Sequence, residues 1–125
     1  ATELSKAADA DLKRIGAELL TAAQALSGVV DWVVASYGDK PRAAHAAAVP
    51  YLKLWGLVAG AWQMARAAQI ASQRLAQGKG DAKFYRGKIA TARFYAESIL
   101  PQASALARSI AGGSEAVLAL ADEQF

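Results

Sequence analysis

Cysteine is absent from the chain of 125 residues, and histidine occurs only once, at position 45. The missing thiols exclude disulfides, thiolate metal sites and cysteine nucleophiles, and they fit an expected cytoplasmic location. His45 lies in an alanine-rich stretch without partner residues for catalysis, so we expect a packed or exposed side chain. Phosphate-binding glycine loops, metal-ligand spacings and nucleophile motifs are missing as well. The sequence therefore predicts no catalytic, cofactor-binding or metal-binding residue.

Long uncharged hydrophobic runs are also missing. The longest apolar run covers residues 54–65, is interrupted by Gln63 and is flanked by Lys53 and Arg66. A membrane-spanning helix needs about 18 uncharged residues, so we expect no transmembrane segment. The chain starts at Ala1 without a methionine or a recognisable signal segment, which fits a piece of a longer protein.

The net charge of +3 is confined to the middle of the chain. Residues 1–38 carry three basic and five acidic groups, residues 39–80 carry six basic and one acidic, and residues 81–125 carry five of each, giving −2, +5 and 0. No run of Lys and Arg is longer than two residues. Because a nucleic acid backbone needs a continuous basic stripe, we expect no nucleic acid partner.

Composition and length favour a single helical domain. Alanine makes up about a quarter of the residues, and β-branched residues are few. We expect an all-α, up-down-up antiparallel bundle of three long helices followed by a short C-terminal helix. The expected helices cover residues 4–37, residues 41–77, residues 81–111 with a bend at Pro101, and residues 114–121, before a frayed tail at residues 122–125. In the second of these helices, Pro50 either kinks the helix or splits off its first two turns.

The second expected helix is apolar around most of its circumference. One apolar face contains Leu54 and Val58, and a second face contains Tyr51, Trp55 and Trp62. A helix that is apolar nearly all round is normally buried, and a three-helix bundle can hardly surround it. We therefore expect another part of the protein, or another subunit, to cover the aromatic face.

The third expected helix begins among four cations. Lys79, Lys83 and Arg86 lie near its start, where they are either a solvated face or a contact for a phosphate group. Lys88 falls on the apolar side of the helix. Its stem either lies over apolar surface with the ammonium group in water, or the charge is held by an ion pair or a bound anion.

Arg93 and Glu97 are four residues apart farther along the same helix. Helical geometry places this pair on the outer face, away from the apolar side. We therefore expect an ordinary surface ion pair, which adds only about 0.3 to 0.5 kcal/mol to stability.

Three segments resemble a known family. They are VPYLKLWGLVAGAW at residues 49–62, KFYRGKIATARFYAESILPQASAL at residues 83–106 and GGSEAVLAL at residues 112–120. Together they resemble the extra C-terminal helical domain of one branch of acyl-CoA dehydrogenases, the methylthiopropanoyl-CoA dehydrogenase type. The likeness extends over essentially the whole chain, although residues 4–37 match only in pattern.

The resemblance implies a helical domain that follows a flavin-binding catalytic core. In such enzymes FAD accepts a hydride from the β-carbon of an acyl-CoA while a glutamate removes the α-proton. None of that apparatus is expected here, so Glu97 and Glu115 are not assigned a catalytic role and the isolated domain should be inactive. The resemblance also implies a homo-oligomeric parent, a homodimer, in which acyl-CoA could reach the cations at positions 79, 83, 86 and 88.

A second interpretation is a free-standing interaction or coating protein that resembles the alanine-rich, phasin-like granule proteins. Such a protein would expose an amphipathic surface by itself, without a core domain to cover it. An upstream coding sequence that continues for some hundreds of residues before Ala1 would favour the dehydrogenase interpretation, and a start codon there would favour the phasin-like one.

Overall fold

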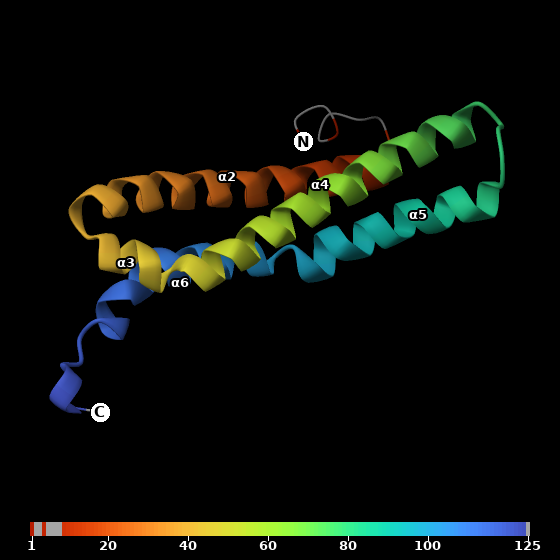
Figure 1. The fold of residues 1–125 in the computed structure, drawn as a ribbon. Helices are drawn as coiled ribbons and strands as arrows, with labels where there is room; N and C mark the ends of the chain where they lie inside the picture. Colours follow the sequence, from red (N-terminus) through yellow and green to blue (C-terminus); the bar gives the residue numbers. More distant parts are fainter. Residues whose placement is uncertain (2–3, 5–8, 125) are drawn as a thin grey trace.

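The computed structural model of the chain describes residues 1, 4 and 9–124, and within them it contains helices and no strand. The elements, labelled as in Figure 1, are α2 (Ala10–Asp39), α3 (Pro41–Ala46), α4 (Ala48–Ala76), α5 (Ala82–Phe94), the π-helix η1 (Tyr95–Ile99), α6 (Gln102–Val117) and the short 3₁₀-helix η2 (Asp122–Gln124). The prediction of an all-α bundle is confirmed.

The long helices lie along one another (Figure 1). The chain turns at α3, α4 returns beside α2, and after a second turn the segment from α5 to α6 runs back along both. The second turn contains Gly78 and Gly80 at φ of 64° and 76°, a left-handed conformation that glycine adopts without steric cost. Only the last part of the chain, beyond the end of α6, extends away from the bundle in this view.

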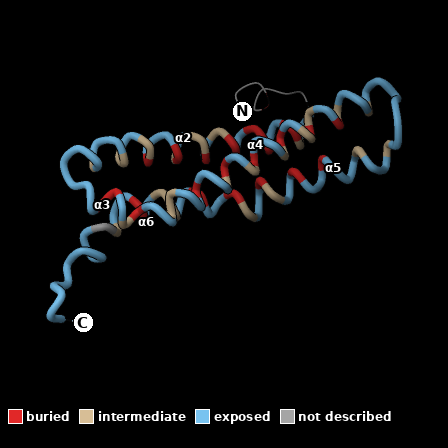
Figure 2. The backbone as a smooth tube through the Cα atoms, in the orientation of Figure 1, coloured by how far each residue is buried: buried red, intermediate tan, exposed pale blue. Residues whose placement is uncertain are grey.

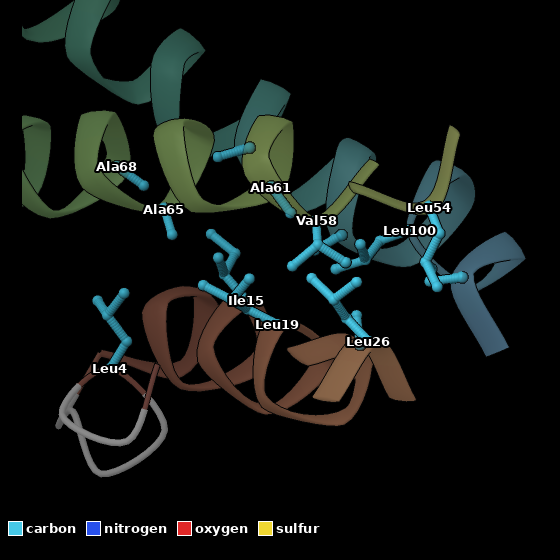
Figure 3. Close-up of a cluster of buried hydrophobic side chains, with 14 of the residues drawn as sticks. Leu4, Ile15, Leu19, Leu26, Leu54, Val58, Ala61, Ala65, Ala68 and Leu100 are labelled. Atoms are coloured by element: carbon cyan, nitrogen blue, oxygen red, sulfur yellow. The ribbon is translucent and has the colours of Figure 1, made fainter. Parts of the chain in front are cut away.

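The core is a seam between the apolar stripe of α2 and a row of small residues on α4. Figure 3 shows Ile15, Leu19 and Leu26 of α2 pointing toward α4, where alanines meet them. The buried residues of α4 are Leu54, Val58, Ala61, Ala65, Ala68 and Ala71. Because alanine has only a methyl group, the two helices approach closely along this seam. Figure 2 shows the buried positions turned toward the interior of the bundle and the outer faces exposed.

Within the described part of the chain, α2 is long and apolar enough to cross a membrane, judged by length and composition alone. The core helix of a bundle passes the same test, and the apolar stripe of α2 packs against α4 and α6. The longest apolar run of the sequence, residues 54–65, lies in α4 and not in this helix.

The first helix begins later than the sequence predicted. Asp9 has an extended backbone (φ −73°, ψ 123°), and its carboxylate accepts hydrogen bonds from the N–H groups of Asp11 (2.9 Å) and Leu12 (3.2 Å). This N-cap starts the helix at Ala10, so the prediction of one helix from Leu4 was wrong. Residues 5–8 of the predicted helix lie outside the described residues, whereas Leu4 is described and buried in the core.

The second predicted helix is divided at Ala47, between α3 and α4, as in the alternative in which its first two turns are split off, and it is not kinked at Pro50 itself. Pro50 lies in the first turn of α4, where a missing N–H group leaves no intrahelical bond broken. Its ring would clash with the carbonyl group four residues earlier, at Ala46, if one helix continued through both positions. The interruption therefore lies on the N-terminal side of the proline and not at the proline itself.

The third predicted helix is interrupted by the π-helix η1, which ends two residues before Pro101. The N–H group of Leu100 donates to the carbonyl of Tyr95 at 2.9 Å, a bond to the fifth preceding residue. Pro101 has no N–H group, and its ring excludes a regular α-helical carbonyl at Glu97. The wider turn accommodates the proline, so the predicted simple bend is a change of helix type.

The widened turn places Tyr95 against α4. Its hydroxyl group donates a hydrogen bond to the carbonyl of Leu57 at 3.1 Å. A Cβ atom added at Gly60 would lie 2.6 Å from that hydroxyl oxygen and 3.2 Å from Cζ of the same ring. The absence of a side chain at Gly60 is therefore what allows the ring to reach α4, whereas Gly56 faces open space.

The C-terminal part also differs from the prediction. Helix α6 continues through Gly112 and Gly113 to Val117, so the predicted end at residue 111 and the separate helix at residues 114–121 were wrong. Neither glycine has a positive φ, and residues around Ile110 and Val117 line a small hollow against the junction of α3 and α4. This contact keeps the helix continuous. The predicted frayed tail contains η2, and Phe125 lies outside the described residues.

The two α4 glycines give a matched test of this packing. Replacing Gly56 with Ala should stabilise the chain by about 0.5 to 1 kcal/mol, because alanine is the better helix former and meets no neighbour. Gly60→Ala should be less stable than Gly56→Ala by about 1 to 3 kcal/mol, because the methyl group displaces Tyr95. Urea unfolding curves measure both. Tyr95→Phe should reduce the difference, and equal stability of the two alanine variants would contradict the close contact.

Candidate functional site

The start of α5 is closed to an added anion by its own N-cap. The carboxylate of Asp81 accepts hydrogen bonds from the N–H groups of Lys83 (2.8 Å) and Phe84 (3.3 Å). A phosphate group placed there would meet a negative carboxylate and N–H groups that are already bonded. Any anion contact of the neighbouring cations must therefore use their side chains alone.

The four predicted cations do not converge on one point. Lys83 and Lys88 line a shallow hollow of about 410 Å³ on α5, together with Phe84, Gly87 and Thr91 among others. Arg86 does not line this hollow: it lies about 200° around the helix from Lys88, although it neighbours Lys83 at a spacing of three residues. Lys79 belongs to the turn that precedes α5. The structure thus brings Lys83 and Lys88 to one hollow, and it separates Lys88 from Arg86.

Lys88 is exposed, and its ammonium nitrogen lies 5.1 Å from the centre of the Phe84 ring. This position corresponds to the first of the two interpretations of Lys88, an aliphatic stem over apolar surface with the charge in water. The ring also contacts Tyr85 edge-on, with centroids 5.6 Å apart. The hollow therefore has one aromatic side chain, Phe84, and its rim carries the two lysines together with the carboxylate of Asp81.

The aromatic face of α4 is open to solvent. Trp55 and Trp62 keep 46% and 49% of their surface exposed, and Tyr51 is half-buried with its ring 6.4 Å from that of Trp55. The guanidinium of Arg66 lies 5.1 Å above the Trp62 ring. Four large exposed residues of this face, here called the outer stripe, are Leu52, Trp55, Trp62 and Ile70. In the part of the chain that the structure describes, no helix covers this stripe.

A network of charges joins α2 to the segment from α5 to η1, and the sequence analysis missed it. Arg93 contacts Asp11 of α2 at 2.6 Å and Glu97 at 3.2 Å, and Glu97 also contacts Arg14 of α2 at 3.3 Å. Arg14 in turn lies 3.6 Å from Glu18. The predicted surface pair of Arg93 and Glu97 is confirmed, but the prediction was incomplete, because it treated one helix in isolation and further partners lie on another helix.

The pKa of Arg93 is raised above its usual value by the hydrogen bond that it donates to Asp11 and then by the one that it donates to Glu97. Arginine is already fully charged at any physiological pH, so the raised pKa does not change the protonation state of Arg93 in that range. Glu97 is held by two guanidinium groups on the protein surface. The arrangement suits the alignment of helices, and it provides neither a free base nor an enclosed reaction volume.

The largest cavity among the described residues lies where the end of α2 meets α3 and the end of α6, with a volume of about 750 Å³. Trp32 and Ser36 form its half-buried side, and Lys40, Arg42 and Glu115 contribute charges of both signs. The sequence analysis did not predict this cavity. Lys40 and Arg42 flank Pro41 in the sequence, but their proximity to α6 depends on the fold.

Metal binding finds no support in the described residues, where no group of three or more His, Cys, Asp or Glu side chains converges. His45 is exposed and packs edge-on against Tyr37, with ring centroids 5.9 Å apart. Within the same residues every buried side-chain nitrogen or oxygen has a hydrogen-bond partner. The described residues therefore contain no buried polar side-chain atom that is left free to bind a ligand.

Comparison with known proteins matches most of the chain. The family described as acetyl-CoA dehydrogenase C-terminal like matches residues 1–121 of the chain. The chain belongs to this family. The 3-methylmercaptopropionyl-CoA dehydrogenase of Ruegeria pomeroyi is 41% identical over 103 residues, which are 82% of this chain and 17% of that protein. The chain thus spans about a sixth of its curated relative. Membership of the dehydrogenase C-terminal family confirms the resemblance seen in the sequence, and the phasin-like alternative is not supported.

The charge network predicts a salt-dependent stability. Arg93→Gln should lower the urea midpoint at low ionic strength, because it removes the contacts to Asp11 and Glu97 that join two helices. The loss should shrink in 1 M NaCl, where the screening length falls to about 3 Å. Arg108→Gln, on exposed α6 surface, is the matched control and should change little at either salt concentration. A loss for Arg93→Gln that is the same in high salt would argue against an electrostatic role.

Proposed function

We propose that this chain is the C-terminal accessory domain of an FAD-dependent acyl-CoA dehydrogenase and that it packs against the catalytic core of the parent polypeptide. The observation that carries the proposal is the family match over residues 1–121, combined with a relative named as a dehydrogenase of which the chain spans 17%. The exposed aromatic residues of α4 support the packing role, because covering solvated tryptophan side chains with a partner surface is favourable.

Catalysis is assigned to the core of the parent and not to this domain. The flavin of such an enzyme, when bound, accepts the hydride from the acyl-CoA. The residues described here do not fit FAD, because they form no glycine-rich phosphate cradle and leave no buried polar side-chain atom unpaired. Glu97 is engaged by Arg93 and Arg14, and Glu115 is exposed at the rim of the end cavity, so neither is placed to remove a proton from a bound thioester.

The parent is further proposed to be a cytoplasmic homodimer that oxidises an acyl-CoA. The absence of cysteine from this chain supports the location, and the family resemblance supports the dimer. In the dimer the domain contributes buried surface and orientation, and it adds no reacting group.

The proposed function is tested on the parent polypeptide and on this chain in parallel. The purified parent should carry flavin, measured by the visible absorbance band of FAD. It should also reduce a dye acceptor in the presence of acyl-CoA. This chain alone should remain colourless after incubation with FAD and should not oxidise acyl-CoA. A stoichiometric flavin spectrum from the chain alone would sink the accessory role, and a parent without flavin would sink the dehydrogenase assignment.

Contact of the domain with the nucleotide end of acyl-CoA is a separate prediction. If CoA reaches α5, its phosphates should meet the hollow between Lys83 and Lys88, the two cations that share it. Lys83→Glu and Lys88→Glu in the parent should then raise KM for acyl-CoA several-fold with kcat nearly unchanged, because uniform binding is lost. Arg108→Glu, on the exposed surface of α6, is the matched control. Unchanged KM in both lysine variants would dismiss the contact.

A further inference from the structure

Helix α4 combines an exposed apolar surface with a complete lack of acidic residues. Its 29 residues contain Lys53, Arg66 and Arg74 and neither Asp nor Glu. The deficit extends beyond the helix, because the sequence has no acidic residue between Asp39 and Asp81. A helix whose outer surface mixes cations with apolar groups, and has no negative charge of its own, complements a surface that is apolar and acidic.

The cations and the apolar residues share one side of the helix. At about 100° per residue, Arg66, Arg74 and the four residues of the outer stripe fall within a sector of about 120°. Along the axis, Leu52, Trp55 and Trp62 lie in the first half of α4 up to its middle, and Arg66, Ile70 and Arg74 lie in the second half. The arginines are exposed. The face is therefore apolar in its first half, whereas in its second half two cations lie on either side of the apolar Ile70.

We propose that the outer stripe of α4, extended by Arg66 and Arg74, is the surface by which this domain docks onto the flavin-carrying remainder of its parent chain. That remainder presents an apolar area opposite Leu52 and Trp55 and carboxylates opposite the two arginines. The proposal rests on the proposed function above. It names the face and the chemistry of the partner surface, which the family assignment does not.

A second copy of the domain fits this face poorly. A two-fold symmetric contact places the same patch of both subunits together, so every charge must be neutralised by the same patch of the partner. Since α4 has no acidic residue, Arg66 and Arg74 would be buried against apolar groups or against each other. Burying an unpaired charge is strongly unfavourable, so a heterologous acidic surface is favoured.

A lipid surface also fits less well than a protein surface. Helices that lie on a membrane carry cations along the length of their polar face, beside the apolar side. In α4 the two arginines of the outer face are confined to one half of the helix, and the side opposite the outer stripe is already packed in the core. The curated relative also has most of its length outside the matched segment, which supplies a protein surface in the same polypeptide.

The proposal is tested by cysteine labelling in the full-length parent. Leu52→Cys places a thiol where 74% of the leucine is exposed in this domain, and Val34→Cys on α2, where 70% of the valine is exposed, is the matched reference. Peptide mass spectrometry of maleimide-treated protein follows each site separately, native and after denaturation in urea. We expect Leu52→Cys to label at least about tenfold more slowly in the native than in the denatured parent, and more slowly than Val34→Cys.

Charge reversal tests the electrostatic half of the face. The pair Arg66→Glu and Arg74→Glu should restore labelling at Leu52→Cys, whereas Arg108→Glu on α6 should not. Circular dichroism checks that the helical content is unchanged, as expected for exposed positions. Protection that survives the double reversal would contradict the acidic partner surface.

Three further outcomes would overturn the docking proposal. Rapid labelling of Leu52→Cys in the native parent would show an open face. Protection that disappears on dilution would assign the face to a second copy, and protection that requires phosphatidylglycerol vesicles would assign it to a membrane. Flavin absorbance and acyl-CoA oxidation of the same sample separate these results from a failure of the proposed function, because an active flavoprotein with an open stripe overturns the docking alone.

Discussion

The close contact between α2 and the alanine row of α4 is the constraint on which the rest of the structure depends. Ala61, Ala65 and Ala68 are buried where α4 meets the leucine and isoleucine side chains of α2. Apart from Leu54 and Val58, the buried residues of α4 are alanines, and the large residues Leu52, Trp55, Trp62 and Ile70 face outward. Most helices of a bundle bury their tryptophans and expose small or polar groups, and α4 has the reverse arrangement. The exposed aromatic face follows directly from the way the core is made.

The sequence predicted those parts of the fold that depend on one helix at a time. The spacing of apolar residues identified the inward stripe of α2, and the second apolar face containing Trp55 and Trp62 was recognised from helical angles alone. Proline positions marked the approximate places where helices are interrupted. The exact break at Ala47 was not predictable, because a proline disturbs the residues before it and the turn can fall at any of several positions.

Features that join different helices could not be predicted in this way. The charge network required the knowledge that Asp11 and Arg14 lie beside Arg93 and Glu97, which are about eighty residues farther along the chain. The cavity between the end of α2, α3 and the end of α6 likewise forms only when α6 returns to the turn at Pro41. The identity of the predicted cations and their proximity along the chain were readable from the sequence. The structure added that the cap at Asp81 closes the helix start and that Lys83 and Lys88, but not Arg86, line one hollow.

The contact of Tyr95 with Leu57 has a consequence for how the helices are aligned. A row of alanines repeats itself every turn, so burial along that row changes little if one helix slides by about 5.4 Å along the other. The hydrogen bond from the Tyr95 hydroxyl to a single carbonyl, above a single missing side chain at Gly60, is not repeated in this way. Apolar packing thus holds the helices together, whereas this polar contact specifies the longitudinal register of η1 against α4.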